Sequence, residues 1–61
     1  MTTKKATIEI IDRPDNAVDV TVTIDDKSTI AGFKRSHDAH QAVGLVVRTL
    51  GLIGIETEVV Q

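Results

Sequence analysis

The sequence predicts a small α+β domain in which a sheet of three or four strands is covered on one face by a single helix. Three observations lead to this fold class. Residues 36–51 repeat their apolar side chains with the period of a helix, and other stretches alternate apolar and polar side chains as half-buried strands do. The second face of each predicted strand is polar, which is typical of an antiparallel or mixed sheet with helical cover on one side. The expected order is β-β-(β)-α-β, in one domain of residues 1–61 with a loose terminus at 1–4.

The helix is predicted from both its period and its ends. On a wheel of about 100° per residue, one arc contains Ala39, Ala42, Val43, Val46, Val47 and Leu50. Ser36 is expected as the N-cap, because its hydroxyl can accept hydrogen bonds from free amides of the first turn. Asp38 in that turn complements the positive end of the helix dipole. Gly51 is expected to end the helix in the left-handed conformation, with Leu52 packed back against the last turn.

Two strands near the N-terminus are predicted to form an antiparallel hairpin. Residues 5–11 alternate, and residues 17–25 are the clearest strand, with one apolar face made by Val18, Val20, Val22 and Ile24. The segment between them, residues 12–16, contains Pro14 together with acidic and amide residues that are typical of turns.

The remaining strands are predicted from weaker patterns. A tight turn is expected at Asp26–Lys27, although it lacks the usual glycine. Residues 28–33 are either a short edge strand, which we favour, or a loop. Residues 53–60 are expected to form the last strand. If all three earlier strands form a meander, that strand runs parallel to the first and lies beside it.

Composition restricts how the domain can be stabilised and where it acts. A chain of 61 residues buries only about 60% of its unfolded surface, and the absence of cysteine excludes disulfides and thiolate metal sites. Self-association is therefore the expected source of further burial. The net charge of −2 argues against binding to duplex nucleic acid. No apolar run of membrane-spanning length and no secretion signal is present, so a cytoplasmic protein without a membrane partner is expected.

The start of the predicted helix is the candidate ligand site. It comprises Phe33, Lys34, Arg35, Ser36, His37 and His40. Free amides at a helix start attract anions, Arg35 can hold an oxyanion with two hydrogen bonds, and Phe33 can stack on a base. Asp38 opposes an anion because it brings its own negative charge. The alternative interpretation is a capped helix with a solvated basic pair and Phe33 in the core. The sequence contains no glycine-rich phosphate loop.

Metal binding and catalysis are not expected. His37 and His40 are neighbours on a helix, but no third ligand with suitable spacing accompanies them. Ser36 beside His37 does not form a catalytic triad, and a single-helix domain offers little concavity for a pocket. We therefore expect no cofactor, no metal and no enzymatic activity.

A second row of residues on the helix is the candidate oligomer interface. It comprises Gln41, Gly44, Leu45, Arg48 and Leu52, on the side away from the core arc. Gly44 costs roughly 1 kcal/mol relative to alanine, which either close approach of a partner helix or tolerated weakness explains. Pairing of exposed strand edges is the rival route to a dimer. The outer sheet row of Asp19, Thr21, Thr23, Asp25, Glu56 and Glu58 is either a solvated face or a surface that mimics an acidic partner.

Besides a plain structural or assembly subunit, two more specific functions are open on these residues. The first is a homo-oligomer that sequesters an anionic, nucleotide-like ligand, such as a cyclic nucleotide signal, between subunits. The second is an inhibitor or adaptor that binds a protein, for example of a host, through the acidic sheet face or the apolar helix row. In size, single-domain organisation and absence of catalytic motifs, the chain is similar to small accessory proteins of bacteriophages. Some of those inhibit host defence proteins, and others are oligomeric sponges for cyclic nucleotides.

Overall fold

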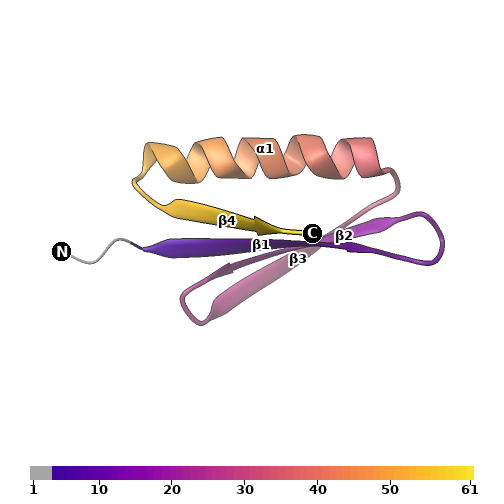
Figure 1. The fold of residues 1–61 in the computed structure, drawn as a ribbon, viewed down its shortest axis with the longest axis horizontal. Coiled ribbons are helices and arrows are strands. Elements are labelled where there is room, and N and C mark those ends of the chain that lie inside the picture. The colour runs from indigo at the N-terminus through magenta and orange to yellow at the C-terminus, as the bar shows by residue number, and fades with distance from the viewer. Residues whose placement is uncertain (1–3) are drawn as a thin grey trace.

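The computed structural model describes residues 4–61 and contains four strands and one helix (Figure 1). The elements are β1 (Lys5–Asp12), β2 (Val18–Ile24), β3 (Lys27–Phe33), α1 (Ser36–Leu52) and β4 (Glu56–Val60). The strands form one sheet in the order β3-β2-β1-β4, and α1 lies across one face of it (Figure 1). The predicted fold class is therefore confirmed. Of the terminus expected to be loose, residues 1–3 lie outside the described part of the chain.

The strand pairing follows the alternation in the sequence. β1 pairs antiparallel with β2, placing Ile8 opposite Val22, and β2 pairs antiparallel with β3. β4 runs parallel to β1, with Val59 opposite Ile8. The expected hairpin and the parallel last strand beside the first are both confirmed. The third stretch is a strand at the edge of the sheet rather than a loop.

The second tight turn lies one residue earlier than predicted. Ile24 pairs with Lys27, so Asp25 and Asp26 form the two-residue loop and Lys27 is the first residue of β3. Asp25 adopts φ 58°, in the left-handed region that aspartate tolerates better than most side chains. The turn therefore needs no glycine.

The core lies between α1 and the sheet face that it covers. Its buried side chains are Ala6, Ile8, Ile10, Val18 and Val20 from the sheet and Ala39, Val43 and Leu50 from the helix. Ala39 is fully buried, and this small side chain permits close approach of the first turns of α1 to the sheet. Phe33 is half-buried and packs against this cluster together with Val46 and Val47. The fully buried part of the core is aliphatic.

The predicted N-cap of the helix is wrong by one residue. Arg35 occupies the cap position with extended backbone angles (φ −129°, ψ 139°), and no side chain caps the helix. The Arg35 carbonyl accepts the amide of Ala39 at 3.2 Å. Ser36 is already the first helical residue, so its hydroxyl is displaced from the capping position. It lies instead 3.2 Å from Nδ1 of His40.

The predicted C-terminal glycine is also wrong, because the helix continues through Gly51 to Leu52. Gly54 is the left-handed residue, at φ 79°. The Ile55 amide donates to the carbonyl of Leu50 at 2.9 Å, and the Gly54 amide donates to the carbonyl of Gly51 at 3.2 Å. These two bonds define a Schellman motif centred on Gly54. Because the motif uses residues 53–55, β4 begins later than predicted.

Candidate functional site

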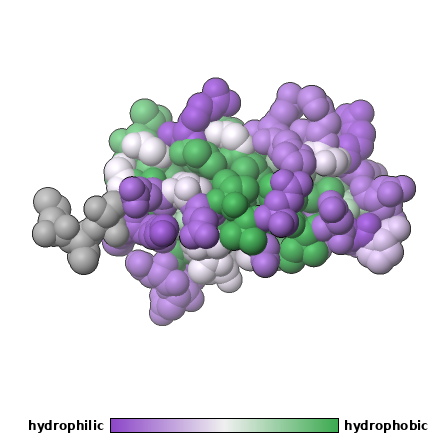
Figure 2. Space-filling view, viewed as in Figure 1, coloured by the Kyte–Doolittle hydropathy of each residue, from purple (hydrophilic) through white to green (hydrophobic). Residues whose placement is uncertain are grey.

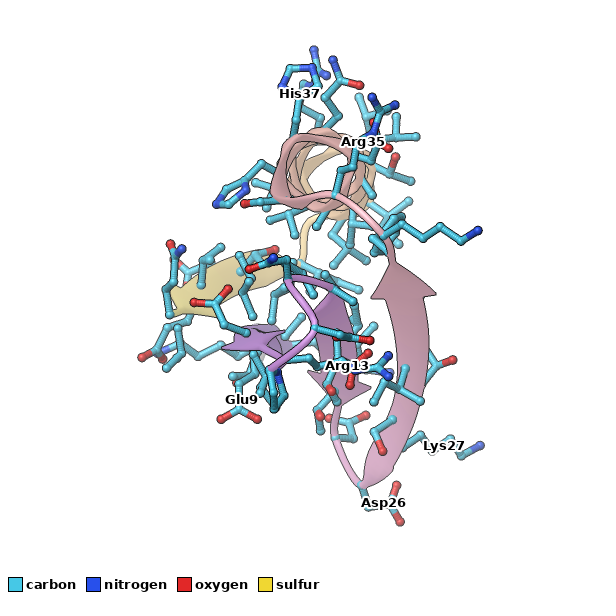
Figure 3. The ribbon with its side chains drawn as sticks, turned by 90° about the vertical axis from the view of Figure 1, so that its right-hand side faces the viewer. Glu9, Arg13, Asp26, Lys27, Arg35 and His37 are labelled. Carbon is cyan, nitrogen blue, oxygen red and sulfur yellow. The ribbon has the colours of Figure 1, made fainter. Side chains whose placement is uncertain are left out.

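The residues at the start of α1 do not converge on one open pocket. Arg35 and His37 lie at the near end of the helix in Figure 3, and both are exposed. Lys34 is exposed as well, whereas Phe33 is half-buried against the core. The ring of Phe33 thus occupies the position that the alternative interpretation gives it. Only part of this ring is open to a stacking ligand.

Arg35 is paired with the acidic residue of the first helical turn. Its Nε donates to Oδ2 of Asp38 at 3.2 Å, and the two side chains are 78% and 42% exposed. Ion pairs this exposed contribute about 0–1 kcal/mol. The guanidinium is therefore held by a weak contact that an external anion must displace.

The two histidines of the helix start make different contacts. Nδ1 of His40 lies 2.8 Å from the carbonyl oxygen of Ser36 and therefore donates to it, because a carbonyl only accepts. Nε2 of His40 lies 3.5 Å from Nε2 of Gln61, at the C-terminal end of the chain. His37 points away from the sheet in Figure 3. Among the described residues, no group of three or more His, Cys, Asp or Glu side chains is placed to hold a metal ion.

The outer face of α1 carries the most exposed apolar side chains of the helix. Leu45 is 61% exposed and Leu52 is 86% exposed. Gly44 and Gly51 lie beside them, and within residues 4–61 a Cβ added at either glycine would meet no atom within 4 Å apart from its chain neighbours and the adjacent helix backbone. Nε of Arg48 donates to the carbonyl of Gly44 at 3.4 Å. We call this face the outer seam; it consists of Gln41, Gly44, Leu45, Arg48, Gly51 and Leu52.

The sequence predicted every residue of the outer seam except Gly51. Gly51 was missed because it was assigned to the end of the helix. Ile53, which is 68% exposed, continues the apolar surface just beyond the helix and was missed because it was assigned to the last strand. Figure 2 shows apolar residues over the C-terminal end of α1 and polar residues over its N-terminal end.

The sheet face away from the helix is mixed rather than acidic. Figure 3 shows Glu9 and Arg13 on this side of the sheet. Arg13 pairs with Asp19 at 3.4 Å and with Asp15 at 3.7 Å, and Lys5 pairs with Glu58 at 3.8 Å. Exposed apolar side chains interrupt the row, namely Ile11, Ile30 and Val60. This arrangement weakens the hypothesis that the face mimics an acidic partner.

A hollow of about 470 Å³ lies at the turn end of the β2–β3 hairpin. It is lined by Lys4, Val22, Ile24, Asp25, Asp26, Lys27, Ser28 and Thr29. The hairpin slants away from α1 here, which leaves Val22 and Ile24 half-buried (Figure 1). None of the predicted ligand residues lines this hollow, and sequence reasoning did not anticipate it.

Comparison with known proteins adds no relative: no family model, no curated protein and no solved structure matches this chain. Within residues 4–61, no helix combines the length and apolar character needed to cross a membrane.

Proposed function

We propose that this protein is a non-enzymatic interaction module that associates with copies of itself through the outer seam of α1. The observation that carries the proposal is the exposure of Leu45 and Leu52, at 61% and 86%. These leucines are seven residues apart, so they lie along one line of the helix. A partner helix packed along this line removes both side chains from water.

The glycines beside the leucines support helix-to-helix packing. Gly44 and Gly51 are also seven residues apart, and each leaves open space where a side chain would stand. Apolar side chains of one helix pack into gaps between residues of the next, so a partner leucine fits over a glycine. The small core gives a reason for this association, because the largest fully buried side chains within residues 4–61 are Ile8 and Val18.

The test replaces both leucines of the outer seam with glutamate. The variant Leu45→Glu/Leu52→Glu is expected to show a lower assembly mass than the natural chain in light scattering at equal concentration. Its helix signal in circular dichroism should be unchanged, because both positions are exposed. Ile11→Glu is the matched control, since Ile11 is exposed on the opposite side of the molecule, at 44%. An unchanged mass for the double variant, or a natural chain that runs as a 6.6 kDa monomer, contradicts the proposal.

A second candidate function is capture of a phosphorylated small molecule at the start of α1. The uncapped helix start favours it, because no side chain accepts the amides of the first turn. Lys34 and Arg35 are exposed beside these amides. In this function Arg35, Lys34 and Ser36 hold phosphate, while His37 and His40 hydrogen-bond to the ligand from the same end of the helix.

This second candidate is tested by thermal shift with inorganic phosphate, nucleotides and cyclic dinucleotides. A ligand at 100 times its Kd stabilises the folded chain by about 2.7 kcal/mol, which raises Tm by roughly 10–20 °C in a domain of this size. Arg35→Ala is expected to abolish the shift. Asp38→Asn is expected to increase it, because the carboxylate that now holds Arg35 is removed. A shift that survives Arg35→Ala places the ligand elsewhere, and no shift with any of these probes excludes the function.

A further inference from the structure

β3 is an edge strand of the sheet, and the direction of its backbone hydrogen-bonding groups can be assigned. Ile24 and Lys27 close a two-residue hairpin loop, and such closing pairs exchange both backbone hydrogen bonds. The pairing of β2 with β1 gives the same alternation of backbone hydrogen bonds along β2. The Arg13 amide donates to the carbonyl of Ala17 at 2.9 Å, so the odd-numbered residues of β2 bond to β1 and the even-numbered ones bond to β3.

Because of this alternation, the backbone amides and carbonyls of Ser28, Ile30 and Gly32 point away from β2, toward the open edge of the sheet. They pair with Thr23, Thr21 and Asp19, which are the odd-numbered residues of β2 that bond to β1. Each therefore offers one donor and one acceptor to a new strand. Ile30 is 63% exposed at the middle of this row.

The β3 edge lacks the features that usually prevent an edge strand from pairing with a strand of another molecule. It pairs with β2 one residue to one residue from Lys27 to Phe33, without a bulge. It contains no proline, and Lys27 at its first position is its one charged residue. Natural edges are usually protected by charges, proline, bulges or shortness. The opposite edge of the sheet, β4, has such protection, because it is shorter and carries Glu56 and Glu58.

We propose that β3 pairs antiparallel with β3 of a second copy of this chain, around a two-fold axis at Ile30. Ile30 then exchanges both backbone hydrogen bonds with Ile30 of the partner subunit. Ser28 pairs with the second copy's glycine at position 32, and Gly32 pairs with its serine at position 28. Every free donor and acceptor of the row is satisfied in this register.

The side chains fit the same register. On the open face of the sheet the two copies of Ile30 become direct neighbours and cover each other. On the helix-facing side Thr29 stands opposite a second Ala31, and Lys27 opposite a second Phe33, so no like charges meet. Antiparallel pairing of β4 with a second β4, around a two-fold axis at Glu58, would bring two carboxylates together. Charge and shape thus select the β3 edge for a second copy.

The β3 pairing uses a different surface from the outer seam and does not depend on it. β3 lies at the edge of the sheet (Figure 1), whereas the outer seam consists of exposed residues of α1. If both contacts form, each copy meets two others and the assembly is larger than a dimer. The two contacts can therefore be removed one at a time.

The test places a charge on the proposed axis. In the Leu45→Glu/Leu52→Glu chain, where the outer seam is disabled, light scattering is expected to give a dimer. Adding Ile30→Lys should produce a 6.6 kDa monomer, because two ammonium groups would meet at the axis. Ile11→Lys is the matched control on the same sheet face away from the edge, and it should leave the dimer intact. Mixing the Ile30→Lys and Ile30→Glu forms of this chain should restore a mixed dimer.

Amide exchange gives an independent readout in the same chain. The amides of Ser28, Ile30 and Gly32 are expected to be protected at high concentration and to lose protection on dilution, whereas Thr29 and Ala31 stay protected throughout by β2. A monomeric Leu45→Glu/Leu52→Glu chain overturns the β3 proposal and leaves the outer seam standing. The β3 proposal is also overturned if the dimer survives Ile30→Lys. The same holds if the Ile11→Lys control dissociates the dimer as well. If Ile30→Lys alone converts the natural chain to monomer, the outer seam fails and the β3 pairing holds.

Discussion

Replacing Ile8 with alanine is expected to destabilise the folded chain by about 2–5 kcal/mol. Ile8 is fully buried in a central strand, with Val22 opposite it on one side and Val59 on the other. Truncation removes apolar contacts and leaves a cavity that the flanking strands cannot close. A domain has only about 0.05–0.15 kcal/mol of stability per residue, so this loss is comparable to the total for 61 residues.

Urea denaturation followed by circular dichroism measures this effect. The midpoint for Ile8→Ala is expected to fall steeply, or the cooperative transition to disappear. Ile11→Ala is the control, since Ile11 lies on the same strand, faces away from the helix and is 44% exposed. It should cost about 1 kcal/mol or less. Equal losses at the two positions would show that burial beneath α1 does not determine stability.

The strands could be predicted because their alternation reports directly which face is buried. Ile8 and Ile10 in β1, and Val18 and Val20 in β2, are all buried as their period requires. Once the core face was fixed, only a helix on that side could cover it. The parallel position of β4 followed from the number of preceding strands.

The ends of elements could not be predicted so well, because competing residues offered the same local signal. Gly51 and Gly54 are both able to end the helix, and burial of Leu50 in the last turn accompanies the choice of Gly54. Ser36 has the chemistry of an N-cap, yet the extended backbone at Arg35 starts the helix one residue sooner. At Asp25 an aspartate took the left-handed angle for which a glycine was expected nearby.

The candidate surfaces could be predicted only where helix periodicity alone decides which side chains are exposed. A helical wheel is enough to place Leu45 and Leu52 away from the core, and both are exposed. The contacts that alter the charge of a surface depend on tertiary placement instead. Arg13 reaches Asp19 across the first hairpin, which neutralises part of the predicted acidic row. The hollow beside β3 likewise exists only because the hairpin diverges from α1 (Figure 1).

Replacing Gly54 with alanine is expected to destabilise the chain by about 1–2 kcal/mol. Gly54 adopts φ 79°, where a Cβ crowds the following carbonyl oxygen, although within residues 4–61 no atom beyond its two chain neighbours would lie within 4 Å of that Cβ. The cost is therefore one of backbone conformation and not of space. Relief of that strain would break the two Schellman hydrogen bonds that hold the segment before β4 against the end of α1.

Gly51→Ala provides a control of opposite sign at a neighbouring glycine. Gly51 lies inside the helix and has open space around it, so alanine is expected to stabilise the chain by about 0.5–1 kcal/mol. Both substitutions are best measured in the Leu45→Glu/Leu52→Glu background, where association through the outer seam does not contribute. Thermal midpoints should then move in opposite directions for two identical changes only three positions apart. A rise of the midpoint in both variants would mean that Gly54 is free of backbone strain and that the helix ends elsewhere, and a fall in both would contradict the expected stabilisation at Gly51.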